Sequence, residues 1–134
     1  IQKDYLIMKL YGIGTDIISI TRIKKLIKNK LFLNRIFNIK EIQKCMKIKN
    51  SYNCFAKRFA AKEAFSKALG TGISKGINFN EIIILNEKNG RPYIKLVDKT
   101  KSVIEKKLKK KIFKISLSLT DEDNYAVAFV TISI

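Results

Sequence analysis

Residues 51–69 constrain the fold more than any other part of this sequence. Apolar residues recur there at helical spacing and Gly70 follows them, so the pattern predicts one long helix with a glycine stop. The stripe expected to be buried consists of Phe55, Phe59, Ala60, Ala64, Ala68 and Leu69. The small alanines in this stripe predict a close approach to another helix or to a sheet.

The remaining segments predict short helices and an antiparallel sheet packed on this helix. Asn38 followed by Glu41 is typical of a capping box, and Asn89-Gly90 is expected to supply the positive φ angles of a hairpin. Predicted strands are residues 10–14, 82–85, 93–96, 114–120 and 125–132, the last one central, and predicted helices begin at Ser19 and Asn38 and surround residues 103–108. We therefore expect one α+β domain over residues 1–134, with residues 1–8 as a flexible N-terminal extension.

The charge of the chain points to an anionic partner. Lys and Arg number 28 against 11 Asp and Glu, giving a net charge of +17, which attracts phosphates, nucleic acid, anionic lipid or an acidic protein. The absence of histidine excludes Ser-His and Cys-His mechanisms. Cys45 and Cys54 lack metal-ligand spacing, and we expect reduced thiols instead of a zinc site or a disulfide. No apolar run reaches the ~20 residues of a membrane span.

Two carboxylates stand out as candidates for chemistry. Glu63 and Lys67 lie one turn apart on the long helix, and Arg58, Lys62 and Ser66 form the neighbouring row. From the helix alone, a solvated face with an ordinary Glu-Lys pair is the favoured interpretation. Asp16 follows a short strand and two glycines, where it either caps a helix or projects into a cleft. If Asp16 and Glu63 converge, they form an oxygen site suited to Mg²⁺.

Four segments, in order, are similar to the holo-acyl-carrier-protein synthase family of phosphopantetheinyl transferases. They are residues 12–17 (GIGTDI), 58–73 (RFAAKEAFSKALGTGI), 89–93 (NGRPY) and 116–120 (SLSLT), the last followed by 125–128 (YAVA). The second segment is the most specific, because it is long and unbroken. The resemblance implies a transferase that moves 4′-phosphopantetheine from coenzyme A to a serine of an acidic acyl carrier protein for fatty acid biosynthesis.

The resemblance also implies roles for individual residues. Asp16 and Glu63 would bind Mg²⁺, with Glu63 and Lys67 catalytic, and the first helix would dock the carrier protein through Arg22, Lys25 and Leu26. The residues implied to bind coenzyme A are Arg58, Lys62, Ser66, Gly70, Asn89, Gly90, Arg91, Pro92 and Thr120. A homotrimer is implied, with each active site shared between two chains and with no nucleic acid or membrane partner.

Several points stay open at this level. A metal-bound water is favoured as the base, with Glu63 and Lys67 as alternatives. Leu119 stands where the family commonly has histidine, so Leu119→His is expected to tighten coenzyme A binding. A catalytically dead scaffold and a basic nucleic-acid-binding module are the rival interpretations. The composition and the start at Ile1 are compatible with a plastid protein that has lost its targeting segment, and a bacterial cytoplasm is the alternative.

Overall fold

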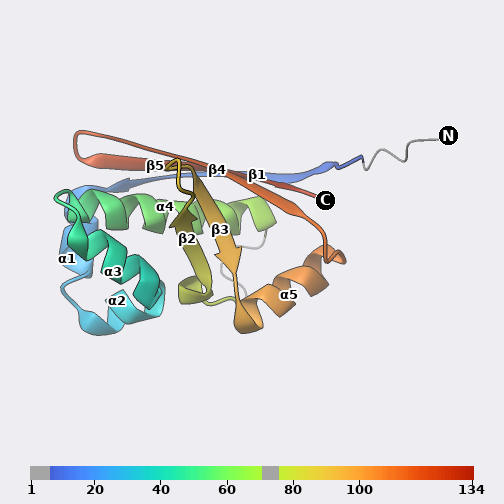
Figure 1. The fold of residues 1–134 in the computed structure, drawn as a ribbon, viewed down its shortest axis with the longest axis horizontal. Helices are drawn as coiled ribbons and strands as arrows, with labels where there is room; N and C mark the ends of the chain where they lie inside the picture. Colours follow the sequence, from blue (N-terminus) through green and yellow to red (C-terminus); the bar gives the residue numbers. More distant parts are fainter. Residues whose placement is uncertain (1–6, 71–75) are drawn as a thin grey trace.

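A long central helix, α4 (Ser51–Leu69), lies along a three-stranded antiparallel sheet (Figure 1). The computed structural model describes residues 7–70 and 76–134, so part of the predicted N-terminal extension and residues 71–73 of the second family segment lie outside it. The sheet has the order β1-β5-β4, formed by β1 (Leu10–Ser19), β5 (Tyr125–Ser133) and β4 (Lys114–Glu122). The predicted central position of the last strand is therefore confirmed.

Helix α4 and strand β1 meet backbone against backbone. A Cβ atom added to Gly14 would lie 1.8 Å from the carbonyl oxygen of Ala64, and one added to Gly12 would lie 2.0 Å from that of Ala68. No side chain larger than hydrogen fits at either glycine, because both contacts are with a rigid helix backbone. The close approach predicted from the alanines is confirmed, and it fixes the position of Asp16 relative to α4.

The other elements cover the opposite side of α4. Three short helices precede it: α1 (Ile20–Leu26), α2 (Lys30–Ile36) and α3 (Ile39–Lys47). After it come the 3-10 turn η1 (Phe79–Glu81), the hairpin of β2 (Ile82–Asn86) and β3 (Pro92–Leu96), and α5 (Asp98–Leu108). The capping box at Asn38 and Glu41 is present. The predicted α+β fold with antiparallel sheets packed by helices is confirmed.

Three local predictions need correction. Strand β1 continues to Ser19, which caps α1, so Asp16 lies within a strand and is not a helix cap. Helix α2 was not predicted, although the side chain of Asn29 caps it by accepting from two backbone amides. In the β2–β3 hairpin only Gly90 has a positive φ, because the connection runs from Glu87 to Arg91 and is longer than a two-residue turn.

The expectation of two reduced thiols is wrong. Cys45 near the end of α3 and Cys54 in the first turn of α4 form a disulfide, with their Cα atoms 5.4 Å apart. The connection between α3 and α4 turns the chain so that the two helices pack side by side, which brings the cysteines into the range for bonding. Spacing rules for metal and redox motifs do not detect such a pair, because its proximity comes from helix packing.

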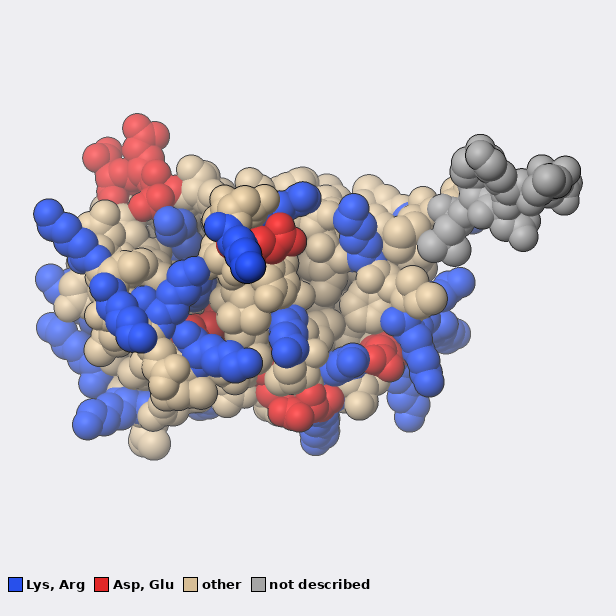
Figure 2. Space-filling model, in the orientation of Figure 1, with Lys and Arg blue, Asp and Glu red and all other residues tan. Residues whose placement is uncertain are grey.

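Basic side chains cover much of the surface shown in Figure 2. Acidic residues gather at the end of the β4–β5 hairpin, where Asp121, Glu122 and Asp123 follow one another. Within residues 7–70 and 76–134, no helix combines the length and the apolar character needed to cross a bilayer. The outer face of the main sheet exposes large apolar side chains from two strands, Ile13, Ile17, Tyr125 and Phe129.

Candidate active site

The structure brings Asp16, Glu63 and Lys67 together where β1 passes over α4. The ammonium of Lys67 donates to the backbone oxygen of Thr15 at 2.9 Å and to Oδ1 of Asp16 at 3.2 Å. The side chain of Lys67 is 55% exposed and that of Asp16 is 18% exposed, so the pair opens to solvent. The convergence of Asp16 and Glu63, which spacing could not establish, follows from the glycine contact between β1 and α4.

The carboxylate of Glu63 is electrostatically strained in this position. Partial burial and then the negative charge of Asp16 raise the pKa of Glu63, while Lys67 and Arg22 oppose the rise. A cation bound beside the two carboxylates would relieve the repulsion that Glu63 experiences from Asp16. Among the residues that the structure describes, no group of three or more His, Cys, Asp and Glu gathers. A cation here would complete its shell with water or substrate oxygens.

Arg58 occupies a different side of α4. It lies five positions before Glu63, which corresponds to a rotation of about 140° around the helix. Its Nη2 donates to Oδ1 of Asn86 at 3.0 Å, and its Nη1 lies 3.1 Å from Sγ of Cys54. The structure therefore does not place Arg58 beside the Asp16–Glu63 pair but beside the β2–β3 hairpin.

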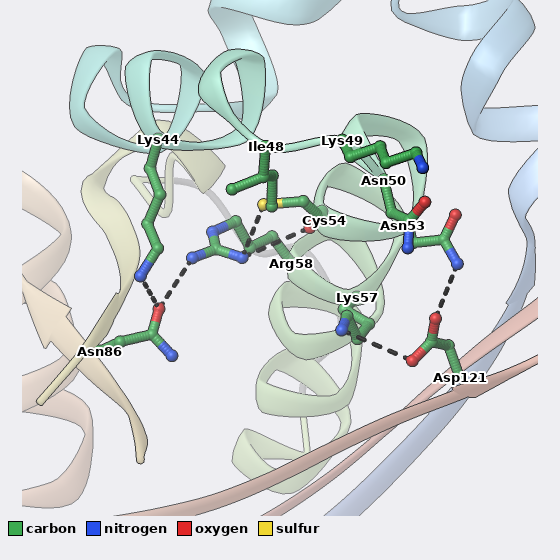
Figure 3. A pocket seen from close by; sticks show the side chains of 10 residues that line it. All are labelled: Lys44, Ile48, Lys49, Asn50, Asn53, Cys54, Lys57, Arg58, Asn86 and Asp121. Atoms are coloured by element: carbon green, nitrogen blue, oxygen red, sulfur yellow. Dashed lines mark hydrogen bonds and ion pairs between the residues drawn. The ribbon is translucent and has the colours of Figure 1, made fainter. Parts of the chain in front are cut away.

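The guanidinium of Arg58 forms one wall of a basic pocket (Figure 3). We call this hollow the Arg58 pocket; it is lined by Lys44, Ile48, Lys49, Asn50, Asn53, Cys54, Lys57, Arg58, Asn86 and Asp121. Lys44 and Arg58 both donate to Oδ1 of Asn86, which places two cations on one amide oxygen. Burial and the nearby charge of Arg58 lower the pKa of Lys44, so the two cations repel each other.

One polar atom in this pocket lacks a partner. Arg58 is only 4% exposed, and its Nε has no hydrogen-bond acceptor among the described residues. Burial lowers the pKa of the guanidinium, which nevertheless keeps its charge because arginine is the strongest base in proteins. A buried cation with an unused donor, next to a second cation, is an arrangement that an anionic ligand would complete.

Two residues predicted to line the nucleotide site lie in the core instead. Lys62 is fully buried, and its ammonium donates to Glu41 at 2.7 Å and to the backbone oxygens of Phe79 and Ile82. Ser66 is also buried and donates to the backbone oxygen of Lys62. Both side chains are buried in the chain, Lys62 against α3, η1 and β2 and Ser66 against the backbone of α4 itself. They are therefore neither a ligand-facing row nor a solvated one in the single chain.

The β4 residues divide between the two faces of the main sheet. Leu119 packs against the core, whereas Thr120 is exposed on the outer face. The next residue, Asp121, returns to the α4 side, accepts from Asn53 at 2.7 Å and pairs with Lys57 at 3.5 Å. Thr120 therefore does not join the Arg58 pocket within one chain.

The hairpin and docking residues lie at the surface. Asn89, Gly90 and Arg91 are exposed at the tip of the β2–β3 hairpin, and Pro92 begins β3. Gly70 ends α4 in the left-handed conformation that the sequence predicted. Arg22 and Lys25 are exposed on α1, with Leu26 half-buried, and Arg22 is close enough to influence Glu63. The predicted docking surface is thus adjacent to the carboxylate pair.

The sequence analysis missed Lys44, Asn86 and Asp121. All three lie outside the four family segments and reach the Arg58 pocket from α3, β2 and β4. The only available signal was that Lys44 follows Glu41 by one turn in a capped helix. That signal does not identify which helix face meets another element.

Comparisons with known proteins agree with this geometry. Residues 12–130 match the family model of the 4′-phosphopantetheinyl transferase superfamily. The holo-[acyl-carrier-protein] synthase of Pelagibacter ubique is 46% identical over 123 residues, covering 92% of this chain and 96% of the relative. The structure of the Neisseria meningitidis synthase has a TM-score of 0.83 at 38% identity, covering 92% of this chain and 98% of that one. The Bacillus anthracis synthase in complex with CoA (3',5'-ADP) has a TM-score of 0.76 at 32% identity, covering 95% and 98%.

Proposed function

Since this chain belongs to the holo-[acyl-carrier-protein] synthases of the 4′-phosphopantetheinyl transferase superfamily, we propose how its residues divide the work of the reaction. The enzyme transfers 4′-phosphopantetheine from coenzyme A to apo-acyl carrier protein. A serine hydroxyl of the carrier attacks the β-phosphorus of the coenzyme A pyrophosphate. The new oxygen–phosphorus bond replaces the bridging bond to the α-phosphate, and adenosine 3′,5′-bisphosphate leaves while a base takes the hydroxyl proton.

The observation that carries the proposal is the meeting of Asp16, Glu63 and Lys67 at the β1–α4 contact. The donor set fits Mg²⁺, which favours a few carboxylates together with water and substrate phosphates. When bound, the metal would neutralise negative charge on the pyrophosphate. The raised pKa of Glu63 fits this assignment, because a nearby cation would relieve the repulsion between the two carboxylates.

Lys67 is suited to holding phosphate charge. Its ammonium is anchored by the backbone oxygen of Thr15 and by Asp16, while more than half of its side chain is exposed. An ammonium has three hydrogens, so one remains for a phosphate oxygen. Because Thr15 and Asp16 already accept hydrogen bonds from this ammonium, we assign Lys67 to holding phosphate charge and not to accepting the serine proton.

The Arg58 pocket is proposed to hold the 3′-phosphate end of the nucleotide. It presents two cations at one amide oxygen and a buried arginine with an unused donor. The second anionic centre of coenzyme A is the 3′-phosphate on its ribose. With this phosphate in the pocket, residues Asn89–Pro92 of the hairpin, which follow the pocket residue Asn86, would contact the nucleotide. A bidentate arginine is the usual protein partner of such a phosphate.

The Glu63 side and the Arg58 side of α4 face different directions, which favours active sites shared between chains. One coenzyme A cannot wrap through the packed helix, so Glu63 of one chain would work with Arg58 of the next. The exposed apolar residues of the outer sheet face, Ile13, Ile17, Tyr125 and Phe129, offer a surface for a homotrimer. Thr120 and the acidic hairpin end would then lie at the junction of two chains.

A mixing experiment tests the shared site. Glu63→Gln and Arg58→Gln variants are each assayed alone and after subunit exchange, at a coenzyme A concentration well below the KM of the Arg58 variant. If sites are shared around a ring, about a quarter of the sites in a random mixture contain both native residues, and activity returns. Mixtures that stay as inactive as the separate variants, despite proven exchange, refute the shared arrangement.

The carrier protein is proposed to dock on α1. Arg22 and Lys25 are exposed there beside Glu63, and an acidic carrier would complement them. The relatives from Pelagibacter ubique, Neisseria meningitidis and Bacillus anthracis are bacterial, which favours a bacterial cytoplasm over the plastid placement suggested by composition. Loss of transfer with Arg22→Glu, at unchanged coenzyme A affinity, is the expected result for a docking residue.

A further inference from the structure

The interior of the fold contains a charged network that the reaction does not use directly. Lys62 donates to Oε1 of Glu41 at 2.7 Å, to Phe79 at 2.7 Å and to Ile82 at 2.6 Å, and it is fully buried. Its three ammonium hydrogens are all taken. Lys62 therefore has no donor left for a substrate, although it belongs to the most specific family segment.

Glu41 is equally saturated. Its Oε1 also accepts from the backbone N–H of Asn38 at 3.0 Å, and its Oε2 accepts from the backbone N–H of Ile84 at 3.2 Å. The pair thus joins the start of α3, the middle of α4, the turn η1 and strand β2. These contacts are directional, so they fix how the elements are rotated as well as how closely they pack.

Three of these elements, α3, α4 and β2, also carry the polar wall of the Arg58 pocket. Lys44 lies one turn after Glu41 on α3, and Arg58 lies one turn before Lys62 on α4. Asn86 lies two residues after Ile84 on β2, on the same side of the strand. The triad Lys44–Asn86–Arg58 therefore repeats, one layer further out, the arrangement Glu41–Ile84–Lys62.

We propose that the Lys62–Glu41 pair is the positioning element of the Arg58 pocket: it holds α3, α4 and β2 so that Lys44 and Arg58 converge on one phosphate. The inference rests on the proposed place of the 3′-phosphate in that pocket. Two cations that repel each other would otherwise move apart when no ligand is present. An apolar core could hold the same elements together, but it would not fix their rotation as a saturated ion pair does.

The test compares coenzyme A with dephospho-coenzyme A, which lacks the 3′-phosphate. Lys62→Met is expected to raise the KM for coenzyme A about tenfold, with kcat and the KM for dephospho-coenzyme A changed less than about twofold. Glu41→Gln should act in the same direction with a smaller effect, because its amide oxygen can still accept from Ile84. Lys101→Met, at an exposed position on α5, is the matched control and should change nothing.

The outcomes separate the possible failures. If Lys62→Met lowers Tm but keeps the native ratio of the two KM values, the pair is only structural and the inference is overturned. If Lys62→Met does not fold, the ratio of the two KM values is measured for Glu41→Gln instead, and a native ratio overturns the inference. Arg58→Gln is run in parallel: an unchanged ratio for this variant refutes the pocket assignment itself, and the positioning role with it. A changed ratio for Arg58→Gln, with native ratios for both buried variants, refutes positioning alone.

Discussion

The two sides of helix α4 differ in how their charges are compensated. On the β1 side, Asp16, Glu63 and Lys67 mix both signs, open to solvent, and leave Glu63 with a raised pKa. On the β2 side, Arg58 and Lys44 both donate to the neutral amide of Asn86, next to the buried Lys62–Glu41 ion pair. In the proposed mechanism the first side, which we call the chemical side, holds the metal and the reacting phosphate. The second side, which we call the recognition side, binds an anionic group of coenzyme A.

The largest expected effect lies on the chemical side. Glu63→Gln keeps the size of the side chain but removes a proposed metal ligand, so kcat should fall by about 10³-fold while coenzyme A still binds. Intact mass of the carrier protein measures the transfer, and calorimetry measures the binding. Glu105→Gln, on α5, provides a control of the same chemistry. Retention of more than about a tenth of the native kcat by the Glu63 variant would remove this residue from the catalytic site.

On the recognition side, we expect the buried Lys62 to make the free energy of unfolding depend on pH. Burial lowers the pKa of Lys62 from 10.5 to about 8, with Glu41 opposing the shift. Between these values the unfolded chain binds a proton that the native protein does not, so the free energy of unfolding rises with pH in this window. The rise from this group is at most about 3 kcal/mol.

Urea unfolding at several pH values isolates this contribution. The native protein is compared with the Glu41→Gln/Lys62→Met double variant. From pH 8 to 10.5, the unfolding free energy of the native protein should rise relative to that of the double variant. All other ionisable groups are the same in both proteins, so the comparison isolates the buried pair. A difference that stays flat across the window would show that Lys62 titrates normally.

The sequence predicted the β1 side of α4 much better than the β2 side. Asp16 and Glu63 were identifiable because glycines, alanines and carboxylates are strong local signals, and the glycines require the strand to touch the helix. The positions of Lys62 and Ser66 were misjudged, because helical periodicity reveals which residues share a face but not what covers a polar face. The buried ammonium of Lys62 is paired with Glu41 from α3, a tertiary contact that residue spacing does not encode.

The next largest expected effect is the loss of stability on reduction of the Cys45–Cys54 disulfide, which lies beside the Arg58 pocket. Cys45 and Cys54 close a short loop between α3 and α4, so reduction should lower the unfolding free energy by about 2–3 kcal/mol. Comparison of native protein with and without reductant, alongside Cys45→Ala/Cys54→Ala, measures this loss. The double variant should not respond to reductant. If the native protein also fails to respond, and its thiols label in denaturant without any reductant, the two cysteines are not bonded in solution.

The smallest expected effect, that of Arg58→Gln, distinguishes coenzyme A binding from catalysis most clearly. Arg58→Gln removes the buried cation but keeps a polar side chain that can reach Asn86, so the KM for coenzyme A should rise about 30-fold, roughly 2 kcal/mol. The kcat at saturating coenzyme A should change less than about threefold, because Glu63 and Lys67 lie on the other side of α4. Lys57→Gln is the matched comparison, since Lys57 lines the same pocket but pairs with Asp121 at the surface, and it should cost only a few-fold in KM. A fall in kcat for Arg58→Gln as large as that for Glu63→Gln would mean that the two sides of the helix act on the same phosphate.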